Sequence, residues 1–220
     1  MTEYRAIIPL AALLVTGCAV GPPSPSTAQP HVAATIVEAT APDRPLRVVF
    51  AWEGMEGDAR FTGQGVARIE PPYQARLDLF GPRGDTYLSA ALVGADLRLP
   101  PGVQGPMIPP PALMWAVLGV VAPPANAVLV GTREQADQTE LYYEVGGGTL
   151  WYILDRGRLR TVRWDEPGRR LAVELRGEME PRLPARAVYQ DPAAVAELML
   201  NLERVDEVEP FPPDIWTPGR

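Results

Sequence analysis

The chain has 220 residues and a formal net charge of -7 at pH 7, and all 20 of its basic residues are arginine. Phosphate backbones repel an acidic protein, so we expect no nucleic-acid partner. The lack of lysine excludes Schiff-base and P-loop lysine chemistry. With one histidine, His31, and one cysteine, the chain cannot build a serine or cysteine triad, or a metal site made of histidine and cysteine.

An apolar run near the N-terminus ends at the only cysteine. Ala6 to Val15 follows the weakly basic Arg5 and is about half as long as the roughly 20 residues of a membrane-spanning helix. The residues Leu14-Val15-Thr16-Gly17 before Cys18 resemble a bacterial lipobox, in which the cysteine is acylated and becomes the mature N-terminus. We therefore predict a signal peptide over residues 1–17 and a lipid anchor, containing palmitate, on Cys18.

The lipid anchor predicts a place in the cell envelope. Ala19 stands where an aspartate often signals retention in the inner membrane. Because alanine and not aspartate occupies position 19, the periplasmic face of the outer membrane is favoured, with the inner membrane as the alternative.

Composition divides the rest of the chain into two parts. Residues 18–40 contain several prolines and serines and few hydrophobic residues, and this composition predicts an extended tether. Residues 41–220 are long enough for one domain with its own core. An acidic, proline-rich tail ends that domain, from Glu209 to Arg220.

Alternation of apolar and polar residues predicts a mostly β domain. Glycine-containing turns separate the alternating runs, for example at 146–148, 155–157 and 166–168. Such short strands favour an antiparallel half-open β-barrel or a strongly curved sheet, with one dry and one wet face. The alternating runs are 46–52, 76–79, 96–99, 140–145 and 170–176.

One stretch, residues 99–132, contains no charged residue and eight prolines. Its longest proline-free apolar part, Ala112 to Ala122, is too short to cross a bilayer. We expect a short buried helix that begins at Pro110-Pro111, ends near Gly119 and acts as a cap or lid. A later segment, Val195 to Val205, fits both a helical stripe and a strand, and periodicity does not decide between them.

Carboxylates are plentiful, and they are the remaining side chains from which a catalytic or metal site could be proposed. Asp165-Glu166 and Glu178-Glu180 are candidate acid–base pairs. The acidic residues of 206–214 resemble a calcium cluster only in composition. We interpret all of them as solvated turns, strand ends and tail, and predict no enzyme activity, catalytic residue, metal or cofactor.

Three patches, in the same order, resemble LolB, an outer-membrane lipoprotein that receives lipoproteins from the periplasmic carrier LolA. Residues 75–84 resemble a strand that ends in the Pro-Leu-Gly loop of this family. Residues 107–119 resemble its short helix, with prolines before a leucine, a tryptophan and a glycine. Residues 183–205 resemble its last strands, which favours a strand at 195–205. The resemblance covers about residues 46–205.

The resemblance implies an apolar barrel cavity that binds acyl chains. The implied partners are the membrane, the acyl chains of lipoproteins or another lipid, and a LolA-type carrier. The implied role is lipoprotein acceptance and localisation in the outer membrane, with a chaperone-like function for the bound chains. The residues expected to line the cavity are Leu77, Leu79, Tyr143, Trp151, Ile153, Leu113, Met114, Trp115 and Leu118.

One position departs from the family pattern. The loop of the family carries an exposed leucine that faces the membrane, and Arg83 occupies that position here. Replacing leucine by arginine costs about 3 kcal/mol at the bilayer centre and less at the headgroups, where arginine can bind an anion. Arg83 and the acidic tail leave an alternative open, a scaffolding envelope lipoprotein that uses the same fold to bind a protein partner.

Overall fold

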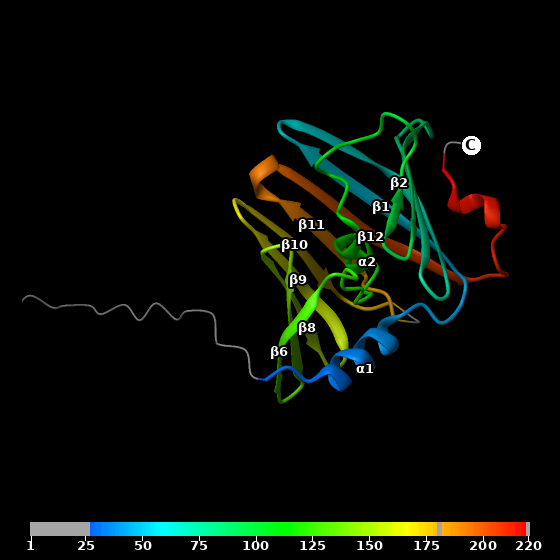
Figure 1. The fold of residues 1–220 in the computed structure, drawn as a ribbon. Helices are drawn as coiled ribbons and strands as arrows, with labels where there is room; N and C mark the ends of the chain where they lie inside the picture. The colour runs from blue at the N-terminus through cyan, green and yellow to red at the C-terminus, as the bar shows by residue number, and fades with distance from the viewer. Residues whose placement is uncertain (1–26, 180–181, 219–220) are drawn as a thin grey trace, which may run out of the picture.

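The computed structural model describes residues 27–179 and 182–218, which contain one twelve-stranded antiparallel sheet. The sheet curves into a half-open barrel, as expected (Figure 1). Its spatial order is β5-β4-β3-β2-β1-β12-β11-β10-β9-β8-β7-β6, so β5 and β6 form the two free edges. The strands are β1 (Leu46–Glu56), β2 (Ala59–Glu70), β3 (Gln74–Phe80), β4 (Thr86–Val93), β5 (Asp96–Arg98), β6 (Val128–Gln135), β7 (Gln138–Val145), β8 (Gly148–Asp155), β9 (Arg158–Glu166), β10 (Arg169–Arg176), β11 (Arg186–Asp191) and β12 (Ala196–Glu207).

The uncharged stretch forms the expected helix, α2 (Pro111–Val117), which lies in the hollow of the sheet (Figure 1). Pro111 stands at the first helical position, where its missing N–H costs nothing. Gly119 ends the segment at a φ of 80°. All residues from Ala112 to Val117 are buried, and α2 packs against β9, β10 and β11. The helix therefore fills the concave side as part of the core.

A second helix, α1 (Pro30–Thr40), overturns part of the expected tether. Proline at the first helical position starts the helix, and Ala33, Ile36 and Val37 repeat at helical spacing on one side. These side chains pack on the core of the domain. Cys18, the signal peptide and the tether up to residue 26 lie outside the described residues. No helix in the described ranges is both long and apolar enough to cross a bilayer.

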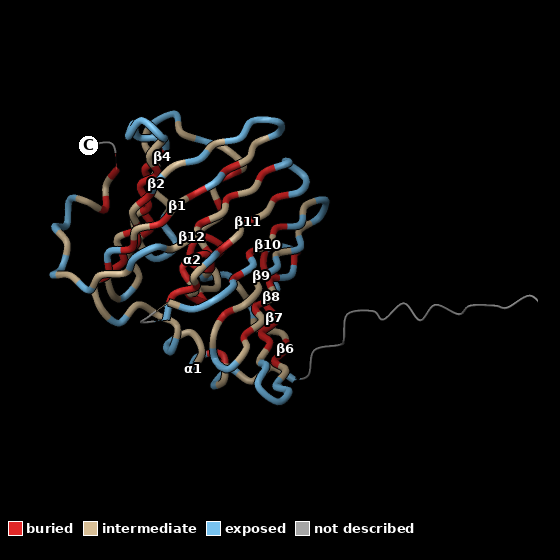
Figure 2. The backbone as a smooth tube through the Cα atoms, turned by 180° about the vertical axis from the view of Figure 1, so that it is seen from behind, coloured by how far each residue is buried: buried red, intermediate tan, exposed pale blue. Residues whose placement is uncertain are grey.

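On the buried concave face, two large aromatic side chains pack closely against glycines of the neighbouring strand. Phe50 and Trp52 of β1 face Gly65 and Gly63 of β2, and a Cβ at Gly65 would collide with the Phe50 ring. At Gly63, a Cβ would collide with the Phe80 carbonyl oxygen. Buried and exposed residues alternate along the strands (Figure 2).

The opposite, convex face is not wet throughout. Asp78 was expected on a solvated face but is 5% exposed, because Arg68, Arg76 and Ser89 surround its carboxylate. Glu140 was likewise expected in water and is 3% exposed, with hydrogen bonds from Arg133, Gln138 and Tyr142.

The C-terminal tail packs over the Asp78 network instead of extending into solvent. Arg76 Nη1 donates to the Ile215 carbonyl (2.8 Å), Arg98 Nη1 donates to the Trp216 carbonyl (3.1 Å), and Trp216 is buried. A 3₁₀ turn, Pro213–Trp216, forms this contact with β3 and β4. The tail is therefore fixed to the sheet through Ile215 and Trp216, while Glu209 and Asp214 stay exposed.

The ambiguous segment Val195–Val205 is a strand. β12 pairs with β1 and β11, and Leu198 and Leu200 are buried on the concave side. A 3₁₀ turn, Pro192–Ala194, precedes it, and Asp191 Oδ1 accepts the Ala194 N–H (3.3 Å). The helix signal at Asp191-Pro192 therefore starts only this turn.

Candidate functional site

An apolar cavity of about 490 Å³ lies between α1, α2 and the turns after β2 and β4. Its lining contains no charged side chain. Tyr73 comes from the β2–β3 turn, Trp115 from α2 and Trp164 from β9. The lining residues are Val37, Tyr73, Gly94, Ala95, Pro111, Ala112, Trp115, Ala122, Pro123, Pro124, Ala125 and Trp164.

Two aromatic residues connect the helices to the sheet at this cavity. Trp115 Nε1 donates to the Gly94 carbonyl (2.7 Å), and the Tyr73 hydroxyl donates to the Val37 carbonyl of α1 (3.5 Å). The rings of Tyr73 and Trp115 meet edge-to-face at 5.6 Å. Burial raises the pKa of Tyr73, so its hydroxyl stays a neutral donor. The polar groups of Trp115 and Tyr73 are thus satisfied within the protein, and both rings offer an apolar surface to the cavity.

A second cavity, of about 300 Å³, lies beside the end of α1 and is called here the arginine cavity. Its aliphatic floor includes Leu46, Ile69, Leu118, Leu159 and Leu183, each less than 8% exposed. Its charged lining residues are Glu38, Asp43, Arg44, Arg158, Arg160, Glu178 and Arg182.

The two cavities are neighbours along the same segments. α1 gives Val37 to the apolar cavity and Glu38 to the arginine cavity. The segment after α2 gives Val120 to the arginine cavity and Ala122 to the apolar cavity. Between them, the Val121 N–H donates to Thr40 Oγ1 (3.0 Å). The last turn of α1 and residues 118–122 therefore form a partition between the cavities.

Of the nine residues expected to line a lipid cavity, Trp115 lines the apolar cavity and Leu118 lines the arginine cavity. The remaining inward-facing residues lie in the core and line neither cavity. They are Leu77, Leu79, Leu113, Met114 and Tyr143.

The expectation for Trp151 and Ile153 is wrong, because both lie on the convex side of β8. Their neighbours Leu150, Tyr152 and Leu154 are the buried residues of this strand. Trp151 stacks on Tyr142 with ring centroids 5.3 Å apart, and Arg163 lies over its ring at 5.5 Å. β8 is apolar on both faces, so alternation could not indicate which face is inside.

Of the twelve residues that line the apolar cavity, the sequence identified only Trp115, and the missed residues include Val37, Tyr73 and Trp164. Val37 lay in the expected tether, although the spacing of Ala33, Ile36 and Val37 is a helical signal. Tyr73 and Trp164 carry no local signal, because only the curvature of the sheet brings them together.

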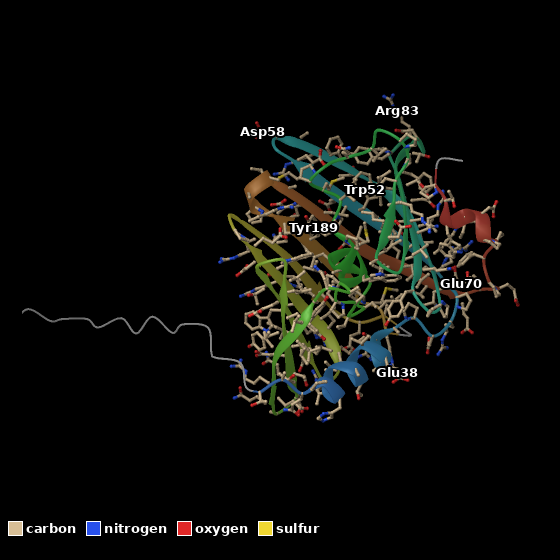
Figure 3. All side chains as sticks on the ribbon, in the orientation of Figure 1. Glu38, Trp52, Asp58, Glu70, Arg83 and Tyr189 are labelled. Carbon is tan, nitrogen blue, oxygen red and sulfur yellow. The ribbon has the colours of Figure 1, made fainter. Side chains whose placement is uncertain are left out.

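Arg83 lies in the exposed loop between β3 and β4, at the opposite end of β3 from Tyr73. Figure 3 shows Arg83 and Asp58 at one end of the sheet, and Glu38 of α1 at the other. At the base of this loop, Tyr87 contacts Trp52 and Phe61 with ring centroids 5.0 and 4.9 Å apart. The loop and the two cavities therefore occupy opposite ends of the barrel.

Two of the four carboxylates considered for acid–base chemistry form ion pairs with arginine. Asp165 pairs with Arg170 (2.9 Å), and Glu178 pairs with Arg160 (2.9 Å) and Arg158 (3.3 Å). Glu180 lies outside the described residues. Within the described ranges, no group of three histidine, cysteine, aspartate or glutamate side chains comes together as metal ligands would.

Comparison with known proteins identifies the fold. Neither a protein-family model nor a curated protein sequence matches this chain. Among solved structures, a LolA superfamily protein from Nitrosomonas europaea is similar, with a TM-score of 0.55, 14% identity, and coverage of 87% of this chain and 98% of that chain. A domain described as an outer membrane lipoprotein-sorting protein, from Vibrio parahaemolyticus, is also similar, with a TM-score of 0.50, 9% identity, and coverage of 84% of this chain and 94% of that chain. The half-open barrel is thus of the LolA/LolB type.

Proposed function

Given the LolA/LolB-type fold, we propose that this protein is a lipid-anchored envelope protein that binds acyl chains in its apolar cavity. The observation that carries the proposal is the cavity of about 490 Å³ lined without a charged side chain. This volume lies within the range of roughly 300–1,000 Å³ of small-molecule sites. Cys18 supplies the anchor in this proposal, through the lipobox that it ends.

The physical basis of such binding is the hydrophobic effect. Each buried methylene contributes roughly 0.8 kcal/mol, so ten methylenes contribute about 8 kcal/mol before the cost of association. No catalytic group is needed to hold or release the chain. A cavity of this kind suits reversible carriage of a lipid.

The specific role that we propose is acceptance of lipoproteins at the periplasmic face of the outer membrane. The lipobox, the barrel of LolA/LolB type and the similarity to a domain described as lipoprotein-sorting support this role. A LolA-type carrier would be the donor, and the acyl chains of its cargo would enter the apolar cavity.

A transfer assay tests the acceptor role. The chain with Cys18→Ser, which carries no acyl group of its own, is mixed with a LolA-type carrier loaded with one lipoprotein, and the cargo is followed by mass. We expect cargo to move to this protein. Cargo that stays on the carrier, while the same chain binds a free acyl lipid, would reject the acceptor role and retain acyl-chain binding.

A further inference from the structure

The arginine cavity gathers four arginines in an acidic protein. Its charged lining residues are four arginines and three carboxylates, an excess of one arginine within the lining, whereas the whole chain carries -7. Arg44 is paired with Asp43 (3.0 Å) and with Glu207 (3.4 Å), which lies outside the lining. Opposite charge within a concave, partly apolar site concentrates an anion there. The aliphatic floor beneath these arginines is suited to a hydrocarbon chain.

The carboxylates of this cavity neutralise its arginines only in part. Arg158 and Arg160 share the single carboxylate of Glu178, at 3.3 and 2.9 Å, and the other acidic partner of Arg160 is 3.8 Å away. Arg182 donates to the Ala39 carbonyl (2.8 Å) and forms no ion pair with any residue in the described ranges. Guanidinium groups with free donors at one site are the arrangement that recognises phosphate.

The position of this cavity connects it to the apolar one. Only the last turn of α1 and residues 118–122 separate the two, with the hydrogen bond from Val121 to Thr40 at their contact. A molecule with a polar head and a hydrocarbon chain can place its head among the arginines and its chain along the apolar lining. An uncharged acyl ligand would use the apolar cavity alone.

We propose that the arginine cavity binds the anionic headgroup of a phosphate-bearing lipid whose acyl chain the apolar cavity holds. This assignment rests on the proposed acyl-chain function and specifies its ligand class. It predicts that a phosphate on the ligand strengthens binding, although the protein as a whole is acidic.

The test compares two ligands with the same acyl chain, a monoacylglycerol and the corresponding monoacylglycerol phosphate. Binding to the chain with Cys18→Ser is measured by calorimetry below the concentration at which either lipid forms micelles. We expect the phosphate-bearing lipid to bind about tenfold more tightly. Inorganic phosphate alone, tested separately, is expected to compete only at far higher concentration.

Two double variants test whether the preference for the phosphate-bearing lipid comes from the arginine cavity. Arg158→Gln with Arg160→Gln is expected to remove most of the tenfold preference and to leave monoacylglycerol binding unchanged, since neither residue lines the apolar cavity. The matched control, Arg170→Gln with Arg204→Gln, changes the net charge equally at positions outside both cavities and should keep the preference. Far-ultraviolet circular dichroism confirms that each variant is folded.

Each alternative outcome has a distinct meaning. Equal affinity of the two lipids, or a preference that both double variants retain, would overturn the headgroup assignment and leave acyl-chain binding intact. Inorganic phosphate that competes as well as the phosphate-bearing lipid would overturn it in favour of a simple anion site. If neither lipid binds, the proposed function itself fails.

Discussion

At the scale of single residues, glycines determine how closely the strands of the barrel approach large side chains. Gly63 lies against Phe80 of β3 and Trp52 of β1, with Trp52 Nε1 2.8 Å from the place of an added Cβ. Trp52 Nε1 also donates to the Phe80 carbonyl (3.0 Å), so neither neighbour can move without losing this bond. The alternating pattern of β2 is interrupted here for a packing reason.

Gly63→Ala tests this packing. We expect a loss of about 1–3 kcal/mol in the free energy of unfolding, because backbone atoms must move apart. Gly105→Ala is the control, since its added Cβ would meet only the flexible end of Glu56. Urea denaturation measures both, and equal losses would contradict the account.

Buried tyrosines predict a loss of stability in alkali. Burial and the Glu140 carboxylate raise the pKa of Tyr142 to about 12, and burial raises that of Tyr189 to about 12. In the unfolded chain both titrate near the ordinary value of 10.0. The folded state therefore holds the proton more tightly, and stability is complete below pH 10 and falls as the pH rises from about 10 towards 12.

The measurement is the free energy of unfolding at pH 8, 9, 10 and 11. We expect nearly the same value at pH 8 and pH 9 and a decline between pH 10 and pH 11. Tyr142→Phe removes one titrating group and should make the decline shallower, whatever its effect at pH 8. A decline that the variant leaves unchanged would show that Tyr142 does not contribute.

At the scale of elements, α1 depends on its contacts with the rest of the domain. An isolated helix of 11 residues is marginal in water. Two hydrogen bonds hold its last turn: the Val121 N–H donates to Thr40 Oγ1 (3.0 Å), and Arg182 Nη1 donates to the Ala39 carbonyl (2.8 Å). The same turn separates the two cavities, so its stability and ligand access are connected.

Thr40→Val removes the acceptor for Val121 at similar side-chain size. We expect a loss of about 1 kcal/mol in stability and faster amide hydrogen exchange within residues 36–40. Thr35→Val is the control, because the Thr35 hydroxyl bonds only within α1, to His31 (2.9 Å). If both variants exchange equally fast, the contact does not hold the helix.

At the scale of the whole molecule, the Arg83 loop and the cavities lie at opposite ends of the barrel (Figure 3). Membrane contact by this loop and lipid binding are therefore separable. Arg83→Leu is expected to increase binding of the Cys18→Ser chain to uncharged phosphatidylcholine vesicles severalfold, since leucine enters a bilayer more favourably than arginine. Affinity for an acyl lipid in solution should not change. Vesicle sedimentation measures membrane binding, with Arg186→Leu as the control for the same substitution elsewhere. A change in the affinity of Arg83→Leu for the acyl lipid would contradict the separation of membrane contact from lipid binding.

The sequence predicted the fold class because alternation and turn residues act locally. It predicted α2 for the same reason, since an uncharged run between prolines leaves few alternatives. It missed α1 because the prolines and serines, which all lie within residues 22–30, determined the prediction for residues 18–40 as a whole. It misassigned the Asp78 face because the tail that covers it is more than 130 residues away along the chain. Of the cavity it found Trp115 only, since Tyr73 and Trp164 meet through tertiary curvature.

The most direct test of the central claim is quenching of tryptophan fluorescence by a monoacylglycerol with a brominated chain. Trp164 lines the apolar cavity and Trp151 lies on the convex face, and neither indole nitrogen has a hydrogen-bond partner among the described residues. Replacing either tryptophan by phenylalanine therefore removes no side-chain hydrogen bond. If the chain occupies the cavity, quenching is strong, falls clearly with Trp164→Phe and is unchanged by Trp151→Phe. Absent quenching, or quenching that Trp151→Phe alone reduces, would contradict acyl-chain binding in this cavity.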